Sequence, residues 1–74
     1  MKPLRVKMTN DYDEGLRLIY REERGYVEDL KQMLSESIID KFASVGFINY
    51  GYTIDHKTWS ISKLGKVYCE DFIL

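Results

Sequence analysis

The sequence predicts an α+β domain in which helices come first, a β-hairpin follows and a last helix closes the chain. Apolar residues recur at helical spacing up to about residue 45, and strict alternation of apolar and polar residues replaces that spacing at 58–62. Gly46 stands between the two patterns, where the backbone has to reverse from a helix into a strand. We divide the 74 residues into an N-terminal arm, 1–9, and one folded domain, 10–74.

The composition is that of a small packed protein, with 45% hydrophobic and 31% charged residues, which argues against disorder. The single cysteine cannot form an internal disulfide, so nothing in the sequence favours secretion. The first residues, MKPLRVKM, lack the apolar run of a signal peptide, and no stretch approaches the length of a membrane span. We therefore expect a cytoplasmic protein with no membrane partner.

The charge is nearly balanced overall and uneven along the chain. The formal net charge is −1. Residues 1–8 carry only bases, residues 9–40 hold nine acids against four bases, and residues 41–74 hold four bases against three acids. Because nucleic-acid binding relies on basic surfaces, a nucleic-acid surface would draw on the two ends of the chain.

The first helix is predicted between about residue 12 and Arg24. Asn10 or Asp11 is suited to the N-cap, and Gly25 is suited to the C′ position, where positive φ is common. The apolar face of this helix consists of Leu16, Ile19 and Tyr20.

In the arm that precedes the helix, residues 5–8 favour a short edge strand.

The segment 27–45 allows either one helix or two. Its apolar residues keep the phase of 3.6 residues per turn throughout, which favours one helix. Ser35 and Ser37 interrupt the middle, however, and serine prefers helix caps to helix interiors. Ser37 with Asp40 resembles a weaker capping box, so we favour two helices, about 27–34 and 37–45. The apolar stripe consists of Val27, Leu30, Leu34, Ile38, Phe42 and Val45.

A two-stranded β-hairpin is predicted next, with strands at about 47–54 and 58–62. Gly51 permits a bulge or a close backbone approach, and residues 55–57 have turn chemistry. Alternation in the second strand directs Trp59 and Ile61 to one face of the hairpin.

The last helix is predicted to begin after Ser62, which is a suitable N-cap. Its apolar residues lie at helical spacing, so we expect them to form its buried face. They are Leu64, Val67, Tyr68 and Phe72.

Two short stretches resemble the winged helix-turn-helix domains of bacterial and archaeal transcriptional regulators. The first is Gly46-Phe47-Ile48, which is similar to the "GLI" step where the third helix of that family ends. The second is Trp59-Ser60-Ile61-Ser62-Lys63-Leu64-Gly65, similar to the "YxLTxxG" stretch that joins the second wing strand to a helix. The resemblance covers about residues 13–72 and implies three N-terminal helices, a hairpin wing and a C-terminal helix.

The resemblance implies binding to double-stranded DNA in transcription regulation. The helix near 37–45 would enter the major groove, and the hairpin would contact the DNA backbone. Glu36 and Asp40 depart from the arginine, lysine, asparagine or glutamine usual on this helix. The arm residues Lys2, Arg5 and Lys7 could neutralise further phosphates. The residues expected to contact DNA are Ser37, Lys41, Ser44, His56, Lys57 and Lys63.

The alternative hypothesis is a winged-helix module that binds protein and has little or no DNA affinity. The chain has six tyrosines and one tryptophan, more than a core of this size needs, and exposed aromatics favour protein contacts. The partner would be another protein or a second copy in a homodimer. The candidate contact residues are Tyr50, Tyr52, Phe72, Ile73 and Leu74.

Catalysis, metal binding and cofactor binding have little support in the sequence. One histidine and one cysteine cannot form a Cys/His zinc set. His56 is expected in a solvated turn, and Cys69 is expected to be a packed or half-buried thiol. Acidic pairs such as Glu22-Glu23 are sequence neighbours, which diverge by about 100° on a helix. No glycine-rich phosphate loop is present, so we predict neither an enzyme nor a cofactor.

Overall fold

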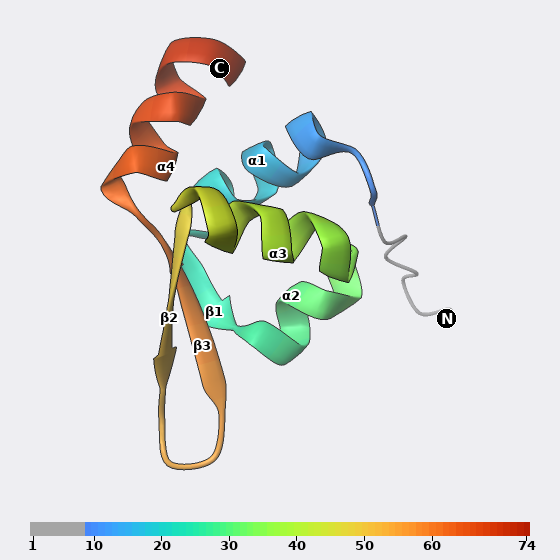
Figure 1. Ribbon diagram of the computed structural model, residues 1–74, viewed down its shortest axis with the longest axis vertical. Coiled ribbons are helices and arrows are strands. Elements are labelled where there is room, and N and C mark those ends of the chain that lie inside the picture. Colours follow the sequence, from blue (N-terminus) through green and yellow to red (C-terminus); the bar gives the residue numbers. More distant parts are fainter. Residues whose placement is uncertain (1–8) are drawn as a thin grey trace, which may run out of the picture.

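A computed structural model describes residues 9–74 and confirms an α+β fold (Figure 1). Three helices precede the hairpin, with a short strand between the first and second. The predicted strand at 5–8 and the arm residues Lys2, Arg5 and Lys7 lie outside the described residues. The elements are α1 (Tyr12–Glu22), β1 (Arg24–Tyr26), α2 (Val27–Met33), α3 (Glu36–Val45), β2 (Ile48–Tyr52), β3 (Lys57–Ile61), α4 (Lys63–Tyr68) and the π-helical turn η1 (Cys69–Ile73).

Helix α1 begins as predicted and ends earlier than predicted. The Asp11 side chain accepts hydrogen bonds from the backbone N–H groups of Asp13 and Glu14, so Asp11 is the N-cap. The predicted end near Arg24 with a Gly25 stop is wrong. Glu23 takes the positive φ of 69° after the last helical residue, and Gly25 lies in β1.

The sheet has three antiparallel strands in the order β1-β3-β2, not the two strands that the sequence predicted. Strand β1 pairs with the edge of β3 that β2 does not occupy, and Gly25 is the residue paired with Trp59. A Cβ at Gly25 would lie 3.3 Å from Trp59 Nε1, closer than ordinary van der Waals contact. The missing side chain at this position lets the indole lie against the strand.

Helices α2 and α3 are separate, as favoured above, and Leu34 and Ser35 form the hinge between them. Both hinge residues have extended backbone, and the Ser35 hydroxyl accepts a hydrogen bond from the Ile38 N–H at 3.4 Å. The predicted cap at Ser37 is wrong, since Ser37 lies inside α3. The apolar stripe stays in phase across the hinge because Leu34 and Ile38 are both buried.

The N-terminal end of the described chain is tied to this hinge. The Thr9 N–H donates to the Met33 carbonyl at 2.9 Å, and the Thr9 carbonyl accepts from the Ser35 N–H at 3.1 Å. The Ser35 hydroxyl also donates to Asn10 Oδ1 at 2.6 Å. Thr9, assigned to the arm, therefore belongs by its hydrogen bonds to the folded domain.

The hairpin follows Gly46, which caps α3 in the left-handed conformation at φ 89°, as predicted. Strand β2 is shorter than the predicted 47–54, and β3 has the predicted length but begins one residue before the predicted 58–62. Their register is continuous from Ile48 opposite Ile61 to Tyr52 opposite Lys57, so Gly51 makes no bulge. The turn beyond is closed by the Thr53 N–H, which donates to the His56 carbonyl at 2.8 Å.

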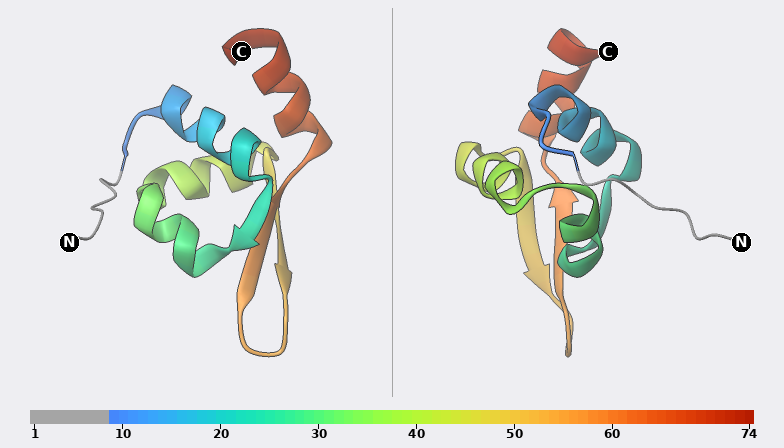
Figure 2. Two further views of the ribbon diagram at one scale, coloured as in Figure 1. Left: turned by 180° about the vertical axis from the view of Figure 1, so that it is seen from behind. Right: turned by 90° about the vertical axis from the view of Figure 1, so that its right-hand side faces the viewer.

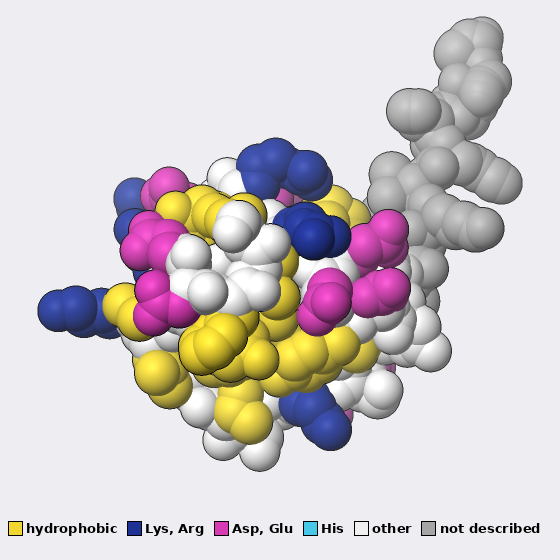
Figure 3. Space-filling view, turned by 90° about the horizontal axis from the view of Figure 1, so that it is seen from above, with side chains coloured by type: hydrophobic (Ala, Val, Ile, Leu, Met, Phe, Trp, Pro, Cys, Tyr) yellow, Lys and Arg dark blue, Asp and Glu magenta, His cyan; other side chains and the backbone are white. Residues whose placement is uncertain are grey.

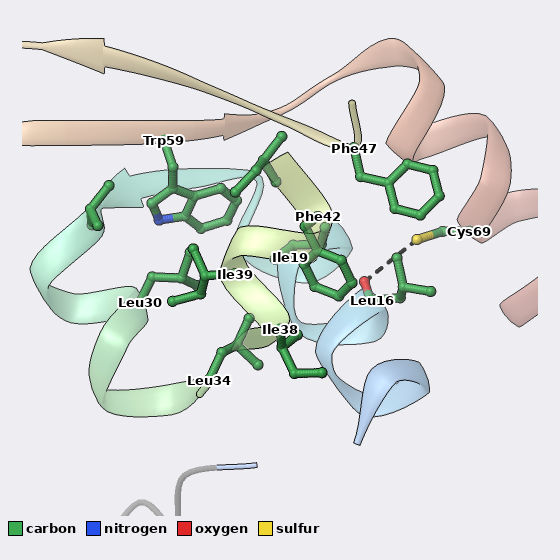
Figure 4. Close-up of a cluster of buried hydrophobic side chains, with 12 residues drawn as sticks. Leu16, Ile19, Leu30, Leu34, Ile38, Ile39, Phe42, Phe47, Trp59 and Cys69 are labelled. Carbon is green, nitrogen blue, oxygen red and sulfur yellow. Dashed lines mark hydrogen bonds between the residues drawn. The ribbon is translucent and has the colours of Figure 1, made fainter. Parts of the chain in front are cut away.

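The core lies between the three N-terminal helices, the inner face of the sheet and the C-terminal helical segment (Figure 4). Phe42 lies near its centre and contacts aromatic rings on both sides, Tyr12 at 5.1 Å and Phe47 at 6.1 Å between centroids. Trp59 closes the core on the side of the sheet and is 3% exposed. The core is therefore one continuous cluster.

The C-terminal helical segment, defined as α4 plus η1, is capped by Ser62 as predicted. The Ser62 hydroxyl accepts from the Gly65 N–H at 3.0 Å and donates to the Gly46 carbonyl at 2.6 Å. The predicted buried face is wrong for Leu64, Val67 and Phe72, which are exposed, whereas Tyr68 is half-buried and packs against the core. The buried positions of this segment are Gly65 and Cys69. A Cβ at Gly65 would lie 2.5 Å from the Phe47 carbonyl oxygen, so only glycine permits this approach.

The C-terminal helical segment and the hairpin turn lie at opposite ends of the longest dimension, 38 Å (Figure 1). The two other views show that the hairpin extends beyond the helices while the C-terminal segment rises on the other side of α1 (Figure 2). The fold therefore places the exposed side chains of the hairpin and those of the C-terminal helical segment at opposite ends of the molecule.

Candidate functional site

Helix α3 presents a polar face to solvent. Ser37, Lys41 and Ser44, three of the residues predicted to contact DNA, are exposed on it together. Glu36 and Asp40 are exposed on the same helix. The outward surface of α3 therefore carries mixed charge.

Lys57 lies beside the first half of α3. Its Nζ is 4.0 Å from the centre of the Tyr50 ring, a cation–π contact across the β2–β3 ladder. Both side chains line a hollow of about 130 Å³ between α2, α3 and the hairpin, together with Glu36 and Asp40. Burial raises the pKa of the Tyr50 phenol, and the nearby Asp40 carboxylate raises it further. Two hairpin side chains and the acids of α3 thus share one hollow.

His56 lies in the hairpin turn, as predicted, and contacts a neighbouring strand. Its ring is 4.9 Å from the ring of Tyr26, on β1. The histidine ring therefore lies against the sheet, whereas Ile54 and Tyr52 near the hairpin end are 96% and 76% exposed.

Lys63 is far from the other predicted DNA-contacting residues of the hairpin. It begins α4, six residues after Lys57, and an extended strand of that length spans about 20 Å. Of the six predicted residues, the structure places three together on α3, two at the hairpin and Lys63 at the opposite end of β3.

The predicted protein-contact residues fall into two groups at the two ends of the molecule. Tyr50 and Tyr52 lie on the hairpin, where Tyr50 is 38% exposed. Phe72 and Leu74 lie on the C-terminal helical segment or just beyond it, and are 70% and 65% exposed. Ile73 is half-buried and packs against the core.

A larger apolar area than the sequence predicted surrounds Phe72. Leu64 and Val67, predicted to be buried, are 54% and 42% exposed. We call Leu64, Val67, Phe72 and Leu74 the C-terminal apolar face. Seen from this end, apolar side chains form a broad band bordered by acidic and basic groups (Figure 3). Helical spacing predicted that Leu64, Val67 and Phe72 share a face, and it could not show which face meets the core.

A second hollow, of about 420 Å³, lies on the outer face of the sheet. Its lining includes Arg24, Tyr26, Thr58 and Ser60, whose side chains point away from Trp59 in the strand register. Gly51 opens the middle of this surface, since a Cβ there would lie 3.0 Å from Thr58 Oγ1. This hollow was not predictable from the sequence, because β1, which forms one side of it, shows no strand pattern.

Cys69 is held as a buried neutral thiol. It is fully buried, and its Sγ donates a hydrogen bond to the Leu16 carbonyl at 3.5 Å (Figure 4). Burial raises the pKa of the thiol, and the nearby Glu70 carboxylate adds to the effect. A thiol in this state is a poor nucleophile, because the thiolate is the reactive form.

Within residues 9–74, no three side chains of the His, Cys, Asp and Glu types come together in a way that could hold a metal ion. None of the helices described in that range is long and apolar enough to cross a membrane. Comparisons of the chain with protein-family models, with curated proteins and with solved structures found no match.

Proposed function

We propose that this chain is a cytoplasmic winged-helix protein that binds double-stranded DNA and regulates transcription. In this proposal α3 lies in the major groove and the β2–β3 hairpin is the wing that contacts the DNA backbone. The observation that carries the proposal is the arrangement of α2 and α3. They are joined by the two-residue hinge Leu34-Ser35, and α3 has a polar outward face beside a projecting hairpin.

The third strand supports the winged-helix assignment. Strand β1 joins the end of α1 to the hairpin through β3, which fixes the hairpin relative to the helices. Gly46 caps α3 and Ser62 bonds to its carbonyl, so the end of α3 is also anchored to α4. A hairpin held at a fixed position beside a helix is suited to contacting a duplex at two places.

The charge on this surface limits the affinity that phosphate contacts supply. Lys41 and Lys57 are the bases of α3 and the hairpin, and Lys63 adds one more. Each phosphate contact contributes about −0.9 to the slope of log K against log salt. Contacts by two or three lysines therefore predict a slope of about −2 to −3 per chain.

The direct test is titration with mixed-sequence duplex DNA at low and moderate salt, followed by fluorescence anisotropy of labelled DNA. We expect binding at low salt that weakens as salt rises. Absence of binding at low salt would refute the proposal.

A charge reversal in the hairpin tests its contact with DNA. Lys57→Glu should weaken binding and reduce the salt slope by about 1, since it removes one phosphate contact. Arg17→Glu is the matched control, because Arg17 is exposed on α1, away from the proposed contact. Equal effects of the two variants would indicate general electrostatics with no specific hairpin contact.

The position of α3 is tested by removing a negative charge. Asp40→Asn preserves shape and should tighten binding severalfold, because a carboxylate near phosphates repels them. Asp29→Asn, on α2, is the matched control for a general change in net charge. Unchanged affinity in Asp40→Asn would place α3 away from the duplex.

A second candidate function is protein binding through the hairpin. It is favoured by the exposure of Tyr52 and Ile54 at the hairpin end and by the acids of α3. This function predicts no DNA affinity at low salt, so the titration above separates the two candidates.

A further inference from the structure

We propose that two copies of this chain form a symmetrical dimer through the C-terminal apolar face, with their C-terminal helical segments antiparallel. This inference is independent of the proposed DNA binding. It rests on the exposure of the segment, on the aromatic contacts that hold the face in place and on the order of charges along it.

The C-terminal apolar face exposes four large apolar side chains on one short part of the chain. Its four members lie between 42% and 70% exposed, on one segment of eleven residues and the residue that follows. A contiguous exposed apolar area of a few hundred Å² commonly marks an interaction site. This exposure favours a partner surface that is itself apolar.

The face is held in place by the core beneath it. The ring of Tyr68 lies 4.9 Å from the ring of Phe47 on one side and 4.9 Å from the ring of Phe72 on the other. Cys69 bonds to the Leu16 carbonyl, and the Tyr20 hydroxyl donates to Glu70 Oε2 at 2.8 Å. The exposed side chains are therefore presented on a fixed support, which lowers the entropic cost of binding.

The charges of the segment identify a second copy as the partner. Lys63 and Lys66 lie near its first turn, and Glu70 and Asp71 lie near its end. This order is unfavourable within one helix, where the dipole favours acids at the start and bases at the end. The ion pairs of the described residues, Arg21–Glu22 and Lys31–Glu36, include none of the four.

A second copy packed antiparallel would offset the unfavourable order of charges and would supply ion-pair partners for the four charged residues. A twofold axis near Val67 and Tyr68 places Leu64 of one copy opposite Phe72 of the other. The basic start of each segment then lies beside the acidic end of its partner. A surface that is self-complementary in this way suits a closed isologous dimer.

Sedimentation equilibrium over a wide concentration range tests the proposal directly. We expect wild type to dimerise and Phe72→Asp to weaken dimerisation about tenfold or more. Tyr52→Asp is the matched control, an exposed aromatic at the opposite end of the molecule. A wild-type chain that stays monomeric up to about 1 mM would overturn the proposal and leave a different protein as the partner. Loss of dimer in Tyr52→Asp alone would instead place the contact at the hairpin.

A charge-swap cycle tests the antiparallel orientation. Lys63→Glu and Asp71→Lys should each weaken the dimer, and the double variant should restore it. The two residues are eight positions apart, about 12 Å along one helix, so restoration requires the pair to meet between copies. Additive losses in the double variant would rule out the antiparallel arrangement.

Circular dichroism of each variant confirms the fold, and all substituted side chains are exposed, so misfolding does not account for loss of dimer. The measurements contain no DNA. A chain that dimerises without binding DNA refutes only the proposed function, and a monomer that binds DNA refutes only this inference.

Discussion

Gly15 in α1 and Gly65 in α4 both lie in helices, and they differ in what lies opposite them. A Cβ at Gly65 would meet the Phe47 carbonyl oxygen at 2.5 Å, whereas a Cβ at Gly15 would meet the Phe42 ring atom Cζ at 3.1 Å. The Phe47 carbonyl also accepts a hydrogen bond from the Ser62 N–H at 2.8 Å. Backbone fixed by such a bond yields less easily than the end of a side chain.

The two glycines therefore predict different costs for alanine. Gly65→Ala should lower the free energy of unfolding by about 2 kcal/mol, because the backbone of Phe47 must shift. Gly15→Ala should be nearly neutral, since crowding offsets the gain of about 1 kcal/mol in helix propensity. Urea denaturation of both variants measures the difference. Equal losses would contradict the contrast between backbone and side-chain contacts.

Cys69 predicts a dependence of stability on alkaline pH. Burial raises the pKa of its thiol in the folded protein above the ordinary value of 9.0. The folded state therefore binds the proton more tightly than the unfolded state. This contribution is fully present below about pH 9 and is lost as the pH rises through the raised value.

Urea denaturation between about pH 7 and pH 10 measures this effect. Wild type should lose stability more steeply than Cys69→Ala above about pH 9, although the variant is less stable at neutral pH because of the cavity it leaves. Parallel curves for the two proteins would show that the thiol does not contribute to the pH dependence.

At the scale of elements, the hinge between α2 and α3 decides how α3 is presented. Ser35 bonds to the Ile38 N–H inside α3 and to Asn10 ahead of α1, so one side chain joins three segments. Ser35→Ala should therefore lower the free energy of unfolding by about 1 kcal/mol, the usual cost of a lost N-cap.

Ser37→Ala is the control for this prediction. Ser37 is exposed inside α3, where alanine is the better helix former, so the change should be neutral or slightly stabilising. Thermal unfolding of both variants, followed by circular dichroism, distinguishes them. A larger loss from Ser37→Ala would return the cap to the position that the sequence predicted.

The elements were predictable where one residue type fixes the backbone. Gly46 and Ser62 are such positions, because positive φ and an N-cap hydrogen bond each favour few residue types. Strand β1 was not predictable in this way. It has only three residues, all exposed, and it shows neither alternation nor a turn signal. Its pairing, Gly25 with Trp59 and Tyr26 with Thr58, is with residues more than 30 positions away, so local sequence does not indicate it.

The candidate site was predictable only in part, for a related reason. Spacing on α3 placed Ser37, Lys41 and Ser44 on one exposed face. The contacts of Lys57 with Tyr50 and of His56 with Tyr26 depend on side chains from other strands. Leu64 is exposed because α4 packs against Phe47 through the side that carries Gly65. Gly65 has no side chain, which permits this close approach.

For the whole molecule, the proposed dimer contact and the proposed DNA contact lie at different ends. The C-terminal apolar face and the hairpin turn are separated along the longest dimension (Figure 1). Dimerisation would therefore leave both hairpins accessible, and the two activities can be measured separately.

Dimerisation also predicts that thermal stability depends on concentration. If the folded dimer is in equilibrium with unfolded monomers, the Tm of wild type should rise by about 3 to 6 °C per tenfold increase in protein concentration. Phe72→Asp should have a Tm that does not change over the same range. Calorimetry at several concentrations provides the measurement, and a constant wild-type Tm would argue against a folded dimer.

The position of Trp59 has a practical consequence for these experiments. It is the only tryptophan of the chain, it is 3% exposed, and it is paired with Gly25 on one side and Tyr50 on the other. Its intrinsic fluorescence should shift to longer wavelength when β1 separates from the hairpin and water reaches the indole. One native chromophore thus reports on the integrity of the sheet without any label.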